Sequence, residues 1–118
     1  SKAQTILYNT SDQVALQTKE KLRLLERTQQ DVQIQKKAAE AAQTYLQGLE
    51  NMEQIRPSLT PEFLLVKLQA QELLAEAKRS EIRAIAEFNS ALVQLAQATG
   101  TVFQVYQIQT ALEGIVTP

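Results

Sequence analysis

The stretch "RPSLTPEF", residues 56–63, contains two of the chain's three prolines and decides how the chain folds. Proline lacks the amide hydrogen that a helix interior needs, and it restricts the residue before it, so a helix cannot continue through Pro57 and Pro61. Thr60 is suited to cap a new helix, because its hydroxyl can accept a hydrogen bond from the first turn and proline is favoured at the next position. The sequence therefore predicts a turn at residues 53–60.

The residues on both sides of this turn are typical of long helices. The first helix is predicted at residues 2–52, which contain no proline and a single glycine, Gly48, and are rich in Leu, Gln, Ala, Glu and Lys. The second is predicted at residues 61–99, because Gly100 can adopt the left-handed conformation that ends many helices. The tail, residues 100–118, is expected to pack back as a short helix or an extended segment.

Composition supports a purely helical chain. The 118 residues include no cysteine, histidine or tryptophan, three glycines and three prolines. With a rise of 1.5 Å per residue, the two helices would be roughly 75 and 60 Å long, far above the ordinary globular helix of ~11 residues. We therefore predict an all-α fold, a long antiparallel two-helix coiled-coil hairpin.

Alanine recurs every seven residues along the second predicted helix, and a larger apolar residue follows four positions after three of these alanines. A strict seven-residue repeat is typical of a left-handed coiled coil, in which the repeated column faces a partner helix. Small side chains in that column let the two backbones approach closely. Glu81 is the one polar residue in the pattern. The predicted helix-packing seam consists of Ala70, Leu74, Ala77, Ala84, Phe88, Ala91, Leu95 and Ala98.

The same helix carries a second apolar stripe. A hairpin supplies only one neighbouring helix, so a second stripe requires another partner, either more chain or another subunit. The stripe consists of Leu68, Ala75, Ile82, Ile85, Leu92 and Ala96.

The first predicted helix is less regular. A seven-residue step joins Leu7 to Val14 and, after a gap of eleven residues, resumes at Leu25, which predicts a stutter that locally unwinds the supercoil. The resumed step consists of Leu25, Val32, Ala39 and Leu46. A further stripe of mostly small side chains, which ordinary packing within the hairpin would explain, consists of Ala38, Ala41, Ala42 and Tyr45.

The residue types argue against catalysis, cofactors and nucleic acids. Without histidine or cysteine, the commonest general base, the thiol nucleophile and most transition-metal ligands are absent, so no enzyme, cofactor or metal site is predicted. Glu72 and Glu76 could share a cation, but Arg79 lies within one turn, which favours an exposed polar face. A net charge of -1 provides no basic face for nucleic acid. No apolar run approaches the ~20 residues of a membrane span, and no signal peptide is recognisable.

Four elements of the second helix occur together in the stretch "LTPEFLLVKLQAQELLAEAKRSEIRAIAEFNSALVQLAQATGTV". They are Ala70-Gln71, Leu74 with Ala77, Phe88-Asn89-Ser90-Ala91-Leu92, and Ala98-Thr99-Gly100-Thr101. With these elements the stretch resembles the last long periplasmic helix of the TolC-like outer membrane efflux proteins. "YLQG", residues 45–48, also resembles the Tyr-x-x-Gly that precedes the periplasmic tip in this family. Gly48 and Gln71 lie 23 positions apart, a longer connection than is usual there.

The resemblance implies a structural role in export. Members are trimers whose helical hairpins pack into a tunnel across the periplasm, and the hairpin tips meet a periplasmic adaptor linked to an inner-membrane pump. The chain would then be a hairpin fragment of the periplasmic portion of a bacterial outer membrane channel that exports small molecules or proteins. Membrane contact would be made only by parts absent from this chain. The candidate partner-facing tip consists of Gly48, Arg56, Pro57, Ser58, Leu59 and Thr60.

Two other functions remain open at this point. The hairpin of a periplasmic adaptor would be flanked by lipoyl-like β segments, so β-rich flanks in the full-length gene would favour that function. A generic structural coiled coil explains the seven-residue repeats but leaves the second apolar stripe without a purpose.

Overall fold

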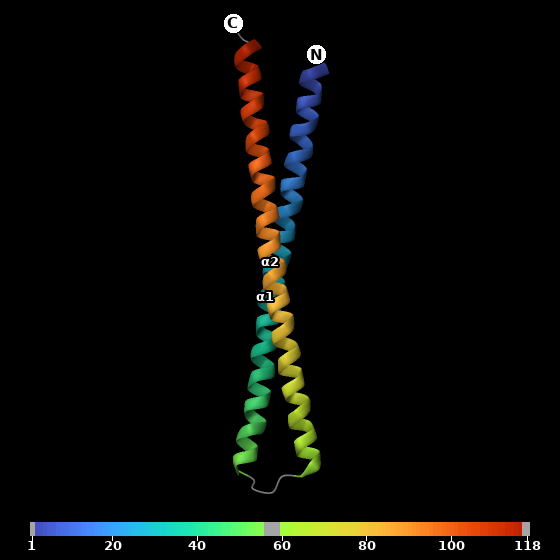
Figure 1. The fold of residues 1–118 in the computed structure, drawn as a ribbon, viewed down its shortest axis with the longest axis vertical. Helices are drawn as coiled ribbons and strands as arrows, with labels where there is room; N and C mark the ends of the chain where they lie inside the picture. Colours follow the sequence, from blue (N-terminus) through green and yellow to red (C-terminus); the bar gives the residue numbers. More distant parts are fainter. Residues whose placement is uncertain (1, 56–59, 117–118) are drawn as a thin grey trace. The chain divides into compact units, whose positions relative to one another are not determined.

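The computed structural model describes residues 2–55 and 60–116, and two α-helices account for nearly all of them. Helix α1 spans Lys2–Ile55 and helix α2 spans Pro61–Val116 (Figure 1). The predicted all-α class is confirmed, since the described residues contain no strand. Residues 56–59 of the predicted turn lie outside the described residues.

The helix ends next to the turn follow from the local sequence. Thr60 caps α2: the Phe63 amide donates a hydrogen bond to the Thr60 hydroxyl at 3.1 Å, and the Leu64 amide donates to the Thr60 carbonyl, also at 3.1 Å. Helix α1 ends at Ile55 rather than at residue 52. Proline restricts only the residue directly before it, so the helix persists closer to Pro57 than the predicted turn at 53–60 allowed.

The predicted end of the second helix was wrong. Helix α2 continues through Gly100 to Val116, so the expected helix at 61–99 is longer than predicted, and residues 100–116 of the expected tail at 100–118 belong to it. Gly100 has no positive φ. A glycine in a helix interior costs about 1 kcal/mol relative to alanine, which weakens a helix without ending it. Val102 and Val105 continue the seam and are half-buried, so packing retains the helix beyond Gly100.

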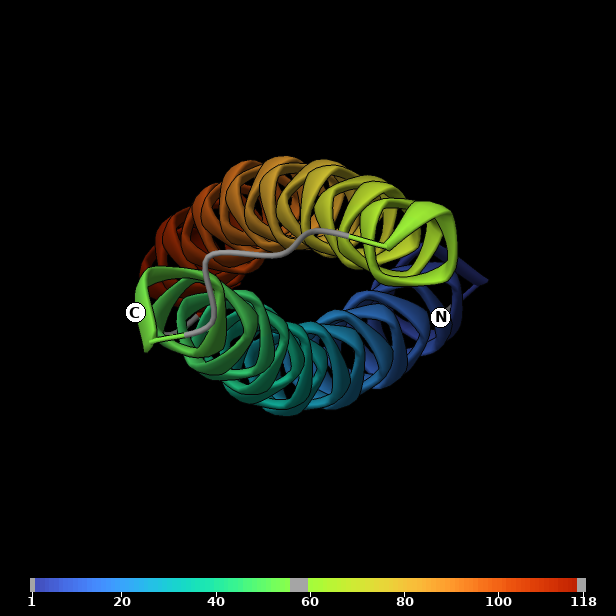
Figure 2. The ribbon, with the colours of Figure 1, turned by 90° about the horizontal axis from the view of Figure 1, so that it is seen from below.

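The chain divides into two compact units, each made from a segment of both helices. Unit 1 contains Ser1–Arg27 and Phe88–Pro118, and unit 2 contains Thr28–Glu87. Within each unit the two segments run in opposite directions, blue against red in unit 1 and green against yellow in unit 2 (Figure 1). Figure 2 shows the helices from the end where the green end of α1 and the yellow-green start of α2 lie nearest the viewer. The predicted antiparallel hairpin is therefore present.

Each unit has a thin core along one seam. In unit 2 the buried cluster combines three residues of α1 with two of α2, and Phe63 and Ala77 pack against it. In unit 1 the buried apolar residues are Val14 and Ala91. No large side chain among the described residues is completely buried, because a pair of helices covers only the facing stripe of each. The cluster of unit 2 consists of Ala42, Leu46, Leu49, Ala70 and Leu74.

The seam of α1 is continuous, and the predicted stutter was wrong. Buried and half-buried positions alternate at steps of three and four residues from Ser11 to Glu53. Alternating steps of three and four give two columns, each of which repeats every seven residues. Val14 belongs to one column and Leu25 to the other, so the eleven-residue gap between them is one step of four plus one of seven, as in an unbroken repeat. Thr18 and Lys21 are the half-buried residues that occupy the seam between them.

Candidate protein interaction surface

All eight predicted seam residues of α2 face inward in their units. Ala70, Ala84 and Ala91 are 1–2% exposed and Leu74 is 9% exposed. The other four, Ala77, Phe88, Leu95 and Ala98, are half-buried. The prediction missed three residues of the same seam, Phe63, Val102 and Val105. Extending the seven-residue step before Ala70 and after Ala98 would have found them.

The candidate tip is described only in part. Gly48 is an exposed residue of α1, and a Cβ placed on it would have no neighbouring atom within 4 Å. Thr60 is exposed and serves as the cap of α2. The remaining predicted tip residues, Arg56, Pro57, Ser58 and Leu59, lie outside the described residues.

Two polar pairs cross between the helices, and three of their residues, Glu53, Lys67 and Lys21, occupy seam positions that the pattern reserves for apolar residues. In unit 2 the Lys67 ammonium lies 2.5 Å from the Glu53 carboxylate, and both side chains are about three-quarters buried. In unit 1 the Lys21 ammonium donates a hydrogen bond of 2.8 Å to the Gln94 side-chain oxygen. Polar pairs in a coiled-coil seam fix the register of the helices, because a shift would leave the charged groups without partners.

The second apolar stripe of α2 lies outside the seam. In unit 2 its large members are well exposed: Leu68 is 52%, Ile82 67% and Ile85 40% exposed, and Ala75 is also exposed. We call these four residues the α2 stripe. Its predicted continuation in unit 1, Leu92 and Ala96, is exposed as well. A row of large exposed apolar side chains on one flank of a helix is typical of a protein interface.

Helix α1 carries a second exposed stripe in unit 2. Ile34 is 63% exposed, Tyr45 50% and Ile55 79%. The small stripe predicted near Tyr45 is divided by the structure, since Ala42 is buried in the seam whereas Ala38 and Ala41 are exposed. We call the exposed set the α1 stripe: Ile34, Ala38, Ala41, Tyr45, Met52 and Ile55.

The two stripes lie on opposite faces of unit 2. An α-helix advances about 100° per residue, so residue numbers give the direction of each side chain relative to the seam. Viewed from its own N-terminus, α2 places its stripe clockwise of the seam, and α1 places its stripe counterclockwise. Because the two segments are antiparallel, these two views look along the unit from opposite ends, so in one common view both stripes are rotated from the seam in the same sense. The seam sides of the two helices face each other, and the stripes therefore lie on opposite faces of the unit. Unit 2 therefore presents an apolar surface on each side.

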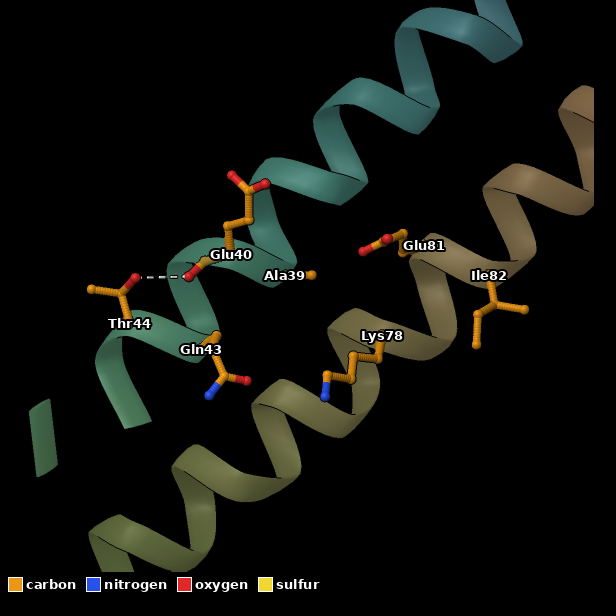
Figure 3. A pocket seen from close by; sticks show the side chains of 7 residues that line it. All are labelled: Ala39, Glu40, Gln43, Thr44, Lys78, Glu81 and Ile82. Atoms are coloured by element: carbon orange, nitrogen blue, oxygen red, sulfur yellow. Dashed lines mark hydrogen bonds between the residues drawn. The ribbon is translucent and has the colours of Figure 1, made fainter. Parts of the chain in front are cut away.

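A shallow groove of about 540 Å³ lies between the helices of unit 2 (Figure 3). It exists because Ala39, a small residue, faces Glu81, which points across the groove (Figure 3). Lys78 extends toward the side where Gln43 lies (Figure 3). The Thr44 hydroxyl, at the rim, donates to the carbonyl of Glu40 at 3.0 Å. The lining residues are therefore polar, half-buried or exposed groups of mixed charge, apart from Ala39 and Ile82.

The carboxylates considered for a cation site form an ordinary surface ion pair. Arg79 donates to Glu76 at 2.9 Å, and both side chains are about 60% exposed. Within residues 2–55 and 60–116, no three acidic side chains are grouped so that they could hold a metal ion. Neither helix, over its described length, is long and apolar enough to cross a membrane.

Comparisons with protein-family models, with curated proteins and with solved structures give no match for this chain.

Proposed function

We propose that this chain is a helical hairpin from the wall of the periplasmic tunnel in a TolC-like outer membrane efflux channel. The observation that carries the proposal is the pair of exposed apolar stripes on opposite faces of unit 2. The resemblance of residues 59–102 to a periplasmic helix of that family supports it. The proposed role is structural.

Two opposite stripes allow hairpins to pack in series. The α1 stripe of one hairpin can cover the α2 stripe of the next, and each of the two hairpins then still has its other stripe available for a further neighbour. Such head-to-tail contacts close into a ring when the rotation between neighbours permits it. A coiled coil that only dimerises would leave one of the stripes in water, which large apolar side chains disfavour.

The remaining parts of the proposal follow from the family resemblance. The assembled protein is a homo-oligomer, a trimer in this family, on the periplasmic side of the outer membrane. The end of the hairpin near Gly48 and Thr60 contacts a periplasmic adaptor, which connects the channel to an inner-membrane pump. Deleting residues 51–60 from the full-length protein should preserve trimer formation and abolish efflux. Efflux that survives this deletion would place the adaptor contact elsewhere.

The test of the wall itself is a charge placed in the α2 stripe. Ile82 is 67% exposed, so Ile82→Glu should leave the hairpin folded while preventing a neighbouring helix from covering it. Ile82→Leu is the matched control, because it keeps a large apolar side chain at the same exposed position. We expect full-length protein with Ile82→Glu to lose its oligomer and dye efflux, and protein with Ile82→Leu to keep both. Normal assembly and efflux of the Ile82→Glu protein would refute the proposal.

A further inference from the structure

Helix α2 carries no charged side chain over most of the part that belongs to unit 1, from Phe88 up to Glu113. None of the chain's 12 basic and 13 acidic residues occurs between Phe88 and Leu112. Every other uncharged run in the sequence is less than half as long. The α1 segment of the same unit is different, since Asp12, Lys19 and Glu20 are all exposed on it. Exposed helix surfaces usually carry charges, so this segment has the composition of a surface that another molecule covers.

Large apolar side chains project outward from this segment at helical spacing. Leu92 and Val93 are 48% and 56% exposed, and Phe103 and Tyr106, about three turns further on, are 62% and 66% exposed. Between these two pairs, the exposed residues on the same side of the helix are the small ones, Ala96, Thr99 and Gly100. We call the whole set the uncharged face: Leu92, Val93, Ala96, Thr99, Gly100, Phe103 and Tyr106.

Gly100 lies in the middle of this face and has no role inside the hairpin. Its backbone is helical without a positive φ, and nothing lies within 4 Å of a Cβ added to it. Glycine at such a position costs about 1 kcal/mol relative to alanine. What glycine offers in return is close approach of another backbone. A helix crossing the uncharged face near Ala96 and Gly100 could come closer there than at any large side chain.

We propose that the uncharged face binds the same face of a second copy of this chain, about a two-fold axis near Ala96 and Gly100. Charge selects this partner, because most other long surfaces of the chain would bring lysine, arginine or carboxylate groups into an apolar contact, and burying an unpaired charge is costly. Only residues 88–112 of another copy offer an uncharged helix of equal length. The shape of the face also fits a self-contact. The two helices would cross at the small residues in the middle of each face, and the large residues at both ends would pack on either side of the crossing. This contact is distinct from the stripes of unit 2 and does not depend on the proposed channel.

Sedimentation equilibrium of the chain, with charges introduced at Ala96, tests the contact. Ala96→Glu and Ala96→Lys each place like charges against one another across the two-fold axis, so each variant alone should weaken self-association roughly tenfold or more. A mixture of the two variants should associate again, because the Glu of one copy then faces the Lys of the other. Thr101→Glu is the control, since it adds the same charge to an exposed position of α2 away from the uncharged face.

The outcomes separate a self-contact from other interfaces. Circular dichroism of each variant at low concentration should show the helix content of the unmodified chain, since Ala96 is exposed. Association that is unaffected by Ala96→Glu, or weakened equally by Thr101→Glu, would overturn the inference. So would a Glu and Lys mixture that stays dissociated, or an unmodified chain that is monomeric at all concentrations. Loss of efflux plays no part in these readouts, so failure here and failure of the channel proposal are distinguishable.

Discussion

Enlarging Ala70 should destabilise unit 2 strongly, because this residue is among the most deeply buried in the seam. Ala70 is 1% exposed and lies in the cluster with Leu46, Leu49 and Leu74, whose exposures are 7–9%. Ala70→Leu adds three carbon atoms where the helices already touch. Overpacking of this kind costs about 1–3 kcal/mol, and the absence of free space beside Ala70 favours the upper half of that range. For a chain of this length each kcal/mol corresponds to about 4 °C in melting temperature, so the upper half of the range is an expected loss of about 8 to 12 °C.

The measurement is thermal unfolding followed by far-ultraviolet circular dichroism, with Ala86→Leu as the matched control. Ala86 lies on the same helix and in the same unit but is exposed. Alanine and leucine have similar helix propensities, so the control should unfold within about 0.5 kcal/mol of the unmodified chain. Equal effects of the two substitutions, whether both small or both large, would show that the alanine column does not form the contact between α1 and α2.

Three further predictions concern the glycine of α1, the cap at the start of α2 and the ion pair that fixes the register. Gly48→Ala should raise the free energy of unfolding by about 0.5–1 kcal/mol, since Gly48 is helical and a Cβ meets nothing within 4 Å; a loss of stability would mean that the helix is distorted there. Thr60→Ala should cost about 1 kcal/mol through loss of the hydrogen bond from Phe63, and Thr60→Ser should restore it; denaturant unfolding measures both. A double-mutant cycle with Lys67→Met and Glu53→Gln should give a coupling of about 1 kcal/mol that decreases with added salt, and a coupling of zero would remove this pair as a register determinant.

The fold could be read from the sequence where one strong signal acts alone. Pro57 and Pro61 interrupt the helices by backbone chemistry that packing cannot reverse, so the hairpin was predictable. Gly100 was misread because a glycine imposes only a weak preference, which the apolar columns on both sides of it override. The stutter predicted between Val14 and Leu25 of α1 was wrong for a related reason. The half-buried polar residues between them also belong to the seam, and the seven-residue repeat is unbroken once they are counted.

The candidate surface was predictable on α2 and less so on α1. The strict repeat from Ala70 to Ala98 separates seam from stripe by residue number alone. On α1 the neighbouring alanines Ala41 and Ala42 are chemically identical, and only the packing against α2 decides that Ala42 is buried and Ala41 exposed. The opposite placement of the two stripes depends on that choice, so it required the structure.

Disulfide cross-linking between neighbouring hairpins tests most directly the central claim that hairpins pack in series through the α1 and α2 stripes. The chain contains no cysteine, so introduced cysteines are the only thiols. Tyr45 belongs to the α1 stripe and Ala75 to the α2 stripe of unit 2, on opposite faces. If hairpins pack in series, the double variant Tyr45→Cys with Ala75→Cys should give a ladder of covalent oligomers on oxidation at micromolar concentration, whereas each single variant should stop at a dimer. A double variant that yields only the monomers and dimers seen with the single variants would contradict the account.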